Sequence, residues 1–481
     1  MVWKLGMIEQ RLEKFGVEKI FVAVFLIFGA INCFVRPPYQ LMDEVNHFAR
    51  AWQISEGIFL SPLKIYDGER NFGWENYSPD AAVEKLYAAR LPSSLVPDEL
   101  IFHVKDDITT FKFSLAALSN FLATPLNVDK REEGLIPNTG IYPPLAYFPQ
   151  AVAAWLGRNL SLTAGAIYYL MNLSGLIFVA TCIFWAMKFL PQAKPLIFLL
   201  AMMPMFLIEA ASTSIDAVIY GVSFLGTAWL LSLKNSAERF SRAEISALII
   251  LSVMLCVKSV YATILLLYFL IPTARAGSLK KFLSLGAAIL LLNLFASLIW
   301  TELALGAGDV VLATSRQYLG VENIDIAAQK AFIIEHPQIF FLAMINALRE
   351  YGLNFCLGFI GTWGATAKVH SAEEFYFLYW IILLGFTLTS GLRFKIGGRV
   401  VMIFAAAISA IAFFIFEYVT WMPVGSTIIR GVQGRYFIPL ALMIFGSLSI
   451  LPPLRHKNLI ALAAGVFSGA MTLQTNLSAF Y

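Results

Sequence analysis

Long apolar runs separated by short polar connections dominate the chain. The runs are continuous rather than alternating, which predicts membrane-spanning helices rather than the strands of a barrel. They lie at residues 20–35, 162–187, 195–213, 216–233, 244–257, 259–274, 281–302, 373–391, 400–421, 436–452 and 458–478. This pattern predicts an all-α integral membrane protein, a polytopic bundle with about eleven spans, although several runs are shorter than the roughly 20 residues of a full span.

The distribution of Lys and Arg predicts how the helices are oriented. These residues gather in alternate connections, which the positive-inside rule assigns to the cytoplasm. The connections are 188–194, 234–242, 275–281, 393–399 and 455–457. Their alternation requires 143–160 and 336–363 to be outer interfacial helices rather than spans, and Arg349 and Glu350 lie in the middle of the second. The expected N-terminus is then cytoplasmic and the C-terminus outer.

The same pattern divides the chain into six parts, because a long polar stretch follows the first span. The parts are a cytoplasmic N-terminal segment (1–19), a first transmembrane helix (20–35), a large outer loop with interfacial helices (36–161), a helix bundle (162–302), an outer loop with an interfacial helix (303–372) and C-terminal transmembrane helices (373–481). No small-residue cleavage site follows the first run, so we expect this helix to be retained. The middle of the large loop, 76–133, is expected to be irregular with short helices.

Composition supports this class of protein. Of the 481 residues, 59% are hydrophobic and 14% charged, and the mean hydropathy is +0.72, values that a soluble globular protein of this size does not reach. The net charge of +4 gives no reason to expect nucleic acid as a partner. The four cysteines stand singly in apolar surroundings, which indicates packing residues rather than disulfides or a metal site.

The most informative polar cluster follows the first span directly. Asp43, Glu44, His47 and Arg50 lie within eight residues. If 42–55 is helical, Asp43 and His47 share one face. A carboxylate beside a histidine can act as a general base or bind a cation. A helix start with a local ion pair would explain the same residues without a functional site.

Three further polar positions are expected on the same outer face. Asp216 lies between two predicted spans and either caps the next helix or joins Asp43 in one cavity. Lys258 lies at the junction of two short runs, where it could neutralise a phosphate or mark a helix end. The segment Gly431–Tyr436 carries Gln433, Arg435 and Tyr436 at a helix entrance. Its glycines permit close backbone approach, and Arg435 offers a fork of donors suited to phosphate. The alternative is that Arg435 extends to the membrane interface beside Tyr436, without binding a ligand.

An aromatic and proline-rich block precedes the predicted interfacial helix 143–160. It includes Tyr142, Pro143 and Tyr147. Such a block either lines a groove at headgroup depth or anchors the helix.

Four segments, taken together, resemble a known family. They are PPYQLMDEVNHFARAWQISEG (37–57), YPPLAYFPQA (142–151), MPMFLIEAASTSIDA (203–217) and GVQGRYFIPL (431–440). In this order they resemble an uncharacterised bacterial family of multipass membrane proteins placed in the GT-C glycosyltransferase superfamily. The resemblance implies a sugar transfer on the outer face of the bacterial cytoplasmic membrane, from a polyprenyl-phosphate-linked donor to a cell-envelope glycan or lipid acceptor, among membrane lipids.

The resemblance also implies roles for the candidate residues. Asp43 takes the position of the acidic residue in the first outer loop, and Asp216 that of the second, with Mg²⁺ or Mn²⁺ as a possible cation between them. The remaining candidates fall into three groups by role: Glu44 and His47 beside the base; Arg435, Lys258, Gln433 and Tyr436 at the donor phosphate; and Tyr142, Pro143, Tyr147 and Arg50 along a substrate groove. Two alternatives remain open: a lipid-linked glycan flippase or exporter, and a non-catalytic envelope scaffold.

Overall fold

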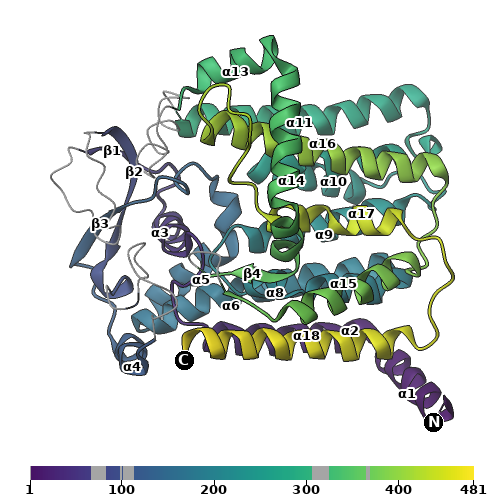
Figure 1. The fold of residues 1–481 in the computed structure, drawn as a ribbon, viewed down its shortest axis with the longest axis horizontal. Coiled ribbons are helices and arrows are strands. Elements are labelled where there is room, and N and C mark those ends of the chain that lie inside the picture. Colours follow the sequence, from purple (N-terminus) through teal and green to yellow (C-terminus); the bar gives the residue numbers. More distant parts are fainter. Residues whose placement is uncertain (1, 67–82, 98–99, 101–112, 306–323, 365–368) are drawn as a thin grey trace.

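The computed structural model describes residues 2–66, 83–97, 100, 113–305, 324–364 and 369–481. Most of its long helices lie along one direction and form a bundle, and a smaller part that contains strands stands at one end (Figure 1). In the described part of the chain, seven helical segments are long and apolar enough to cross a membrane, with Arg242–Leu270 counted as one, or nine if each of two bent helix pairs is one span. The chain is therefore a mostly helical, polytopic membrane protein.

The bundle contains most of the predicted apolar runs. Its elements are α2 (Val17–Val35), α6 (Ala164–Phe189), α7 (Lys194–Ala201), α8 (Pro204–Ala210), α9 (Asp216–Leu233), α10 (Arg242–Leu255), η5 (Cys256–Leu270), α11 (Leu279–Leu305), α15 (Glu373–Leu388), α16 (Ile396–Trp421), η7 (Gly434–Leu440), α17 (Ala441–Ser447) and α18 (Lys457–Phe480). Short 3₁₀ turns η4 (Pro191–Ala193) and η6 (Thr273–Ala276) join neighbours. Helices α7 and α8 form one of the bent pairs, with an angle of 83° between them.

The helical run formed by α10 and η5 reverses direction at Lys258. This residue has non-helical backbone angles, φ −143° and ψ 86°. Arg275, just beyond the run, lies 2.7 Å from Glu244 near its start, and the Phe240 N–H donates to the Arg275 carbonyl at 3.0 Å. Because both ends meet, the run is a hairpin with Lys258 at its tip.

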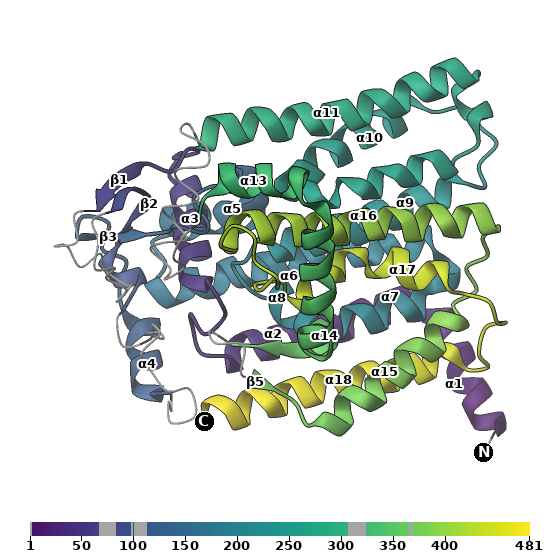
Figure 2. The same cartoon turned by 45° about the horizontal axis from the view of Figure 1, so that its top comes forward.

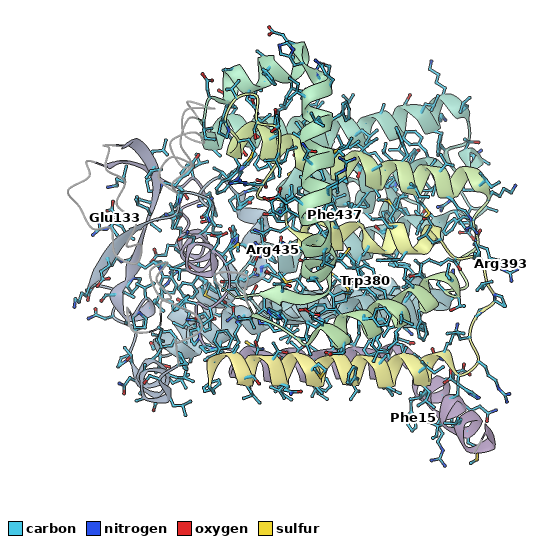
Figure 3. All side chains as sticks on the ribbon, in the orientation of Figure 1. Phe15, Glu133, Trp380, Arg393, Arg435 and Phe437 are labelled. Carbon is cyan, nitrogen blue, oxygen red and sulfur yellow. The ribbon has the colours of Figure 1, made fainter. Side chains whose placement is uncertain are left out.

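The basic connections lie together at one end of the bundle. Lys188 and Lys194 both contact the buried carboxylate of Glu18, at 2.5 and 2.6 Å. Lys234 donates to the carbonyl of Arg393, which Figure 3 shows at the end opposite to Glu133. The chain termini lie at opposite ends, because α2 and α18 run in the same direction (Figure 1). This relative arrangement agrees with the distribution of Lys and Arg.

The strand-containing part, at the opposite end of the bundle from the basic connections, is formed by the large loop that follows α2. It contains η1 (Ser93–Leu95), α3 (Glu44–Ser55), α4 (Leu115–Ala123), η3 (Pro144–Tyr147) and α5 (Phe148–Asn159) beside the strands β1 (Leu63–Tyr66), β2 (Val83–Pro92) and β3 (Arg131–Leu135). The strands form an antiparallel sheet in the order β1-β2-β3, with Leu63 opposite Tyr87 and Ala88 opposite Leu135.

The prediction that 76–133 is irregular with short helices is therefore wrong for β2 and for the start of β3. Residues 86–89 of β2 are all buried, so the strand lacks the apolar-polar alternation that marks a strand with one wet face. Residues 67–82, 98–99 and 101–112 of this loop lie outside the described part.

The second large loop places a helix across the bundle. Helices α13 (Ile326–Glu335) and α14 (Pro337–Gly361) meet at 104°, and α14 crosses the direction of the long helices in both views (Figures 1 and 2). Its surface includes the exposed apolar residues Phe341, Leu342 and Ile345. A short hairpin of β4 (Thr362–Trp363) and β5 (Val369–His370) follows. The prediction that 336–363 is interfacial stays a prediction.

A buried ion pair connects the strand-containing part to the bundle. Arg36 Nη2 lies 2.9 Å from Glu44 Oε1, and both side chains are 1% exposed. Tyr168 donates to the same carboxylate oxygen at 2.9 Å, and the Leu41 N–H donates to the other at 3.1 Å. Arg36 also donates to the carbonyls of Ile208 and Ala211 at the end of α8. The ion pair therefore connects the start of the large loop that follows α2 to α6 and α8.

Loss of the Glu44 carboxylate should destabilise the protein strongly. Glu44→Ala leaves the Arg36 guanidinium buried without its counter-charge, which costs about 3–5 kcal/mol. Replacing both residues by Leu should recover part of that loss, because no charge is then buried. Equilibrium unfolding in detergent micelles measures the effect. Exposed Glu132→Ala, the control, should change stability by less than about 0.5 kcal/mol; an equally small change for Glu44→Ala would contradict this account.

Candidate functional site

A cavity of about 350 Å³ lies where the strand-containing part meets the bundle. Figure 3 shows Arg435, one of its lining residues, in this region. Eight of the residues singled out from the sequence line it: Asp43, His47, Tyr142, Asp216, Lys258, Gln433, Arg435 and Tyr436. The structure thus brings together segments from both ends of the chain in one polar cavity, which has the size of a small-ligand site.

Asp43 reaches the cavity from a left-handed backbone position. Its φ is 60° and its ψ 12°, immediately before α3, and its carboxylate does not cap that helix. Such a backbone conformation is uncommon for a residue other than glycine. The Glu44 N–H donates to the Leu41 carbonyl at 3.2 Å, and the Leu41 N–H donates to Glu44 Oε2. The turn that holds Asp43 is therefore closed by Glu44.

The Asp216 carboxylate lies near two cationic side chains. It begins α9 and does not cap it. Its carboxylate oxygens lie 3.7 Å from Lys258 Nζ and 3.8 Å from Arg435 Nε. Arg435 Nη1 is in turn 2.5 Å from Glu209 Oε1. These four residues form a continuous charged network, all buried or nearly so, because α8, α9, the α10–η5 hairpin and η7 meet here.

The Lys258 ammonium reaches the cavity because Lys258 lies at the tip of the hairpin. The break in the helix at this residue lets its side chain point into the cavity rather than along a helix face. It lies 4.6 Å from the centre of the Tyr436 ring, which is cation–π distance. Lys258, Arg435 and Tyr436 therefore form one cationic and aromatic wall.

His47 is held in a neutral state. Its Nδ1 is 2.7 Å from the Tyr147 hydroxyl, and burial lowers the pKa of His47 to about 3, with Arg435 and Lys258 acting in the same direction and Asp216 against them. Burial also raises the pKa of Tyr147 well above its usual value. Neither group is charged near neutral pH, so the pair of His47 and Tyr147 adds no charge to the cavity beside Asp43.

Four predicted site residues lie away from the cavity wall. Glu44 pairs with Arg36, and Arg50 donates to the carbonyls of Ile58, Phe59 and Tyr142. Tyr147 is fully buried behind His47, and Pro143 precedes η3. Tyr147 and Arg50 contact the lining residues His47 and Tyr142, and Glu44 closes the turn that holds Asp43.

Gly431 and Gly434 allow other parts of the protein to pack closely against the segment 431–434. A Cβ on Gly434 would overlap the backbone of Phe355 and Phe359 in α14. A Cβ on Gly431, where φ is +88°, would lie 2.8 Å from Glu417 Oε2. The sequence predicted the close approach correctly, but the neighbours are α14 and Glu417.

The sequence interpretation missed several lining residues. They are Met42, Asn138, Thr139, Ile215, Phe413, Phe416, Glu417, Trp421 and Gly431. Glu417 carried a usable signal, since it is the one acidic residue in the apolar run 400–421 and ionisable residues within spans usually have a function. The others, including the polar Asn138 and Thr139, carry no signal of their own, because their place at the cavity depends on the tertiary fold.

The lining residues do not form a metal cage. Among the described residues, no group of three or more His, Cys, Asp or Glu side chains is arranged to hold a metal ion. Asp216, one of the two predicted ligands, already faces two cations. The prediction of a divalent cation between Asp43 and Asp216 stays a prediction.

The bundle of span-length helices defines a polytopic membrane protein, and the polar cavity of carboxylates and cations at one end of it is its candidate site. The chain belongs to the family described as "Predicted membrane protein (DUF2142)", whose model matches residues 26–444. Comparison with curated proteins found no match, and neither did comparison with solved structures.

His47 should make the stability of the protein depend on pH. An unfolded histidine binds a proton below a pKa of about 6.5, whereas folded His47 stays neutral down to about pH 3. The unfolded state thus binds more protons between these values, so stability rises with pH there and falls on acidification, by about 1.4 kcal/mol per pH unit.

Melting temperatures of wild type and His47→Gln, measured from about pH 7 to about pH 4.5, test this linkage. Glutamine can still hydrogen-bond Tyr147 but does not titrate, so its melting temperature should fall less steeply on acidification. Exposed His336→Gln is the matched control. Parallel pH profiles for wild type and His47→Gln would show that His47 is not the group responsible.

Proposed function

We propose that this protein is an inverting glycosyltransferase. It would transfer a sugar from a polyprenyl-phosphate-linked donor to a glycan or lipid acceptor of the cell envelope, at the outer face of the bacterial cytoplasmic membrane. The observation that carries the proposal is that Asp43, Asp216 and Arg435 line one cavity. Such a transfer requires a base and a phosphate-binding cation around one reacting centre.

The reaction follows from the roles that these groups can take. The Asp43 carboxylate would accept the proton of the acceptor hydroxyl. The acceptor oxygen would then bond to the anomeric carbon from the side opposite the phosphate. The bond from that carbon to the phosphate oxygen would break, and its electron pair would leave with the phosphate. Lys258 and Arg435 would stabilise the departing charge.

The spacing around Asp216 suits this role. Charge-assisted hydrogen bonds are usually about 2.7–2.9 Å long, whereas the contacts of Asp216 with Lys258 and Arg435 are 3.7 and 3.8 Å. Asp216 thus attracts both cations without closely engaging either. They remain in place as donors to a phosphate, and we assign Asp216 the positioning of these cations.

A second cavity supports a reaction with two substrates. It measures about 620 Å³ and shares Met42, Gly431, Gln433 and Arg435 with the smaller one. Tyr351 and Asn354 of α14 line it as well, and the surface of α14 includes exposed apolar residues. We assign the larger cavity to the part of the lipid carrier next to its phosphate, with the phosphate at the shared Arg435 and the carrier chain along α14.

Removing the Asp43 carboxylate should abolish transfer. Asp43→Asn keeps the size of the side chain but loses the base, so kcat should fall by about 10²–10⁴-fold. The measurement is sugar transfer in proteoliposomes from a panel of polyprenyl-phosphate sugars, with added EDTA as a separate test for a metal. Exposed Asp129→Asn should keep full activity.

Two results would contradict this mechanism. One is undiminished transfer by Asp43→Asn. The other is a folded wild-type protein that transfers no sugar from any donor of the panel, which would favour a flippase or a scaffold instead.

The proposed orientation can be tested by cysteine labelling. With exposed Cys356 replaced by Ala, a single cysteine is introduced at exposed Asp129 in the strand-containing part or at exposed Ala237 in the basic connection after α9. A membrane-impermeant maleimide should label Asp129→Cys on intact spheroplasts and Ala237→Cys after lysis. The reverse result would place the cavity on the cytoplasmic side.

A further inference from the structure

Helix α1 (Val2–Phe15) lies at the end of the bundle that carries the basic connections (Figure 1). It ends one residue before α2, a helix of span length, and the chain changes direction at Gly16, whose φ is +89°. Figure 3 shows Phe15 at the same end of the molecule as Arg393. Because α2 enters the hydrocarbon of the membrane just after Gly16, α1 lies next to the lipid headgroups.

One side of α1 is held by the protein. The Glu9 carboxylate accepts hydrogen bonds from two of the first N–H groups of α18, those of Asn458 at 3.1 Å and Leu459 at 3.0 Å. Leu12 packs against the core. Glu13 lies one turn after Glu9 on the same side, and its charge acts on the start of α18. These contacts determine how α1 is rotated about its axis.

The opposite side of α1 carries exposed apolar and basic residues. They are Met7, Ile8, Arg11, Lys14 and Phe15. At about 100° per residue they fall within one arc of about 120° around the helix axis. Between residues 5 and 15, no acidic residue falls within this arc, because both glutamates lie on the side that faces the bundle. Apolar and basic side chains thus alternate on the face that the protein leaves uncovered.

We propose that this face of α1 binds the anionic headgroups of the adjacent lipid leaflet. A surface helix of this kind places its apolar side chains at the boundary between headgroups and acyl chains, while its cations contact lipid phosphates. Met7, Ile8 and Phe15 provide the apolar contacts. Arg11 and Lys14 provide the cations, whose long side chains can keep the charge at headgroup depth. This inference is independent of the proposed function.

The charges around α1 favour an anionic lipid. Lys19 is exposed at the start of α2, and Arg455 is exposed just before α18. Glu18, beside Lys19, is buried and already contacts Lys188 and Lys194. Positive charge is therefore presented outward here while these carboxylates are turned inward, and an anionic headgroup gives the outward charge its counterpart. The adjacent span places lipid, rather than another protein, beside this face.

Quenching by brominated lipids measures the lipid contact and its charge dependence separately. The two cysteines that are not buried, Cys256 and Cys356, are replaced by Ala, and Ile8→Cys is labelled with a fluorescent dye. Nanodiscs contain an equimolar mixture of phosphatidylcholine and phosphatidylglycerol, with bromines on the acyl chains of one lipid or of the other. Brominated phosphatidylglycerol should quench more strongly, because this lipid is enriched beside the dye. Added salt should reduce the difference.

Neutralising the two cations should remove the preference. Arg11→Gln combined with Lys14→Gln should lower the enrichment of phosphatidylglycerol beside the dye by up to about fivefold per charge. Lys130→Gln, on an exposed lysine of the strand-containing part, is the matched control and should leave the enrichment unchanged.

Two results would overturn the proposal. Equal quenching by the two brominated lipids would show that the face contacts lipid without selecting its charge. Absence of quenching by either lipid, both at Ile8→Cys and at Phe15→Cys as a second dye position, would show that the face binds no lipid and is left to a protein partner. Neither result depends on sugar transfer, so neither decides the proposed function.

Discussion

The buried ion pair between Arg36 and Glu44 determines where the site can form. Both charges are almost fully excluded from solvent, so neither can be lost without leaving the other uncompensated. The pair closes the turn that sets the backbone of Asp43 and, through Arg36, contacts the carbonyls at the end of α8. One interaction thus fixes the distance between the turn at Asp43 and the segment that leads to Asp216.

The site is assembled from helix breaks rather than from regular helices. Asp43 precedes α3 in a left-handed conformation, Lys258 occupies the tip of a hairpin, and Arg435 follows the glycine that packs on α14. At such breaks a side chain can leave the helix surface and the backbone can approach a neighbour closely. The apolar spans hold these breaks at one level of the bundle.

Sequence patterns predicted a polytopic helical membrane protein and much of the cavity, because apolar runs and the charged residues between them leave direct signals; seven to nine spans are found by length and composition in the described part, against about eleven predicted. Asp43, Asp216, Lys258 and Arg435 stand out as polar residues between such runs, and the structure brings them together. The roles of Glu44 and Arg50 depend on partners distant in the fold, such as Tyr168 and the carbonyl of Tyr142. The strand β2 was missed because residues 86–89 are buried on both of its faces, which removes the alternation that identifies a strand.

The charge arrangement also bears on how the proposed reaction would be driven. Lys258 and Arg435 are balanced by Asp216 and Glu209 before any substrate binds. A donor phosphate would compete with Asp216 for these cations. This competition would limit the affinity of the protein for the donor in its ground state. As the bond to the sugar breaks, charge builds on the phosphate, and the same fixed donors stabilise it more strongly. Carboxylates beside the phosphate cations would thus favour the transition state over the bound donor.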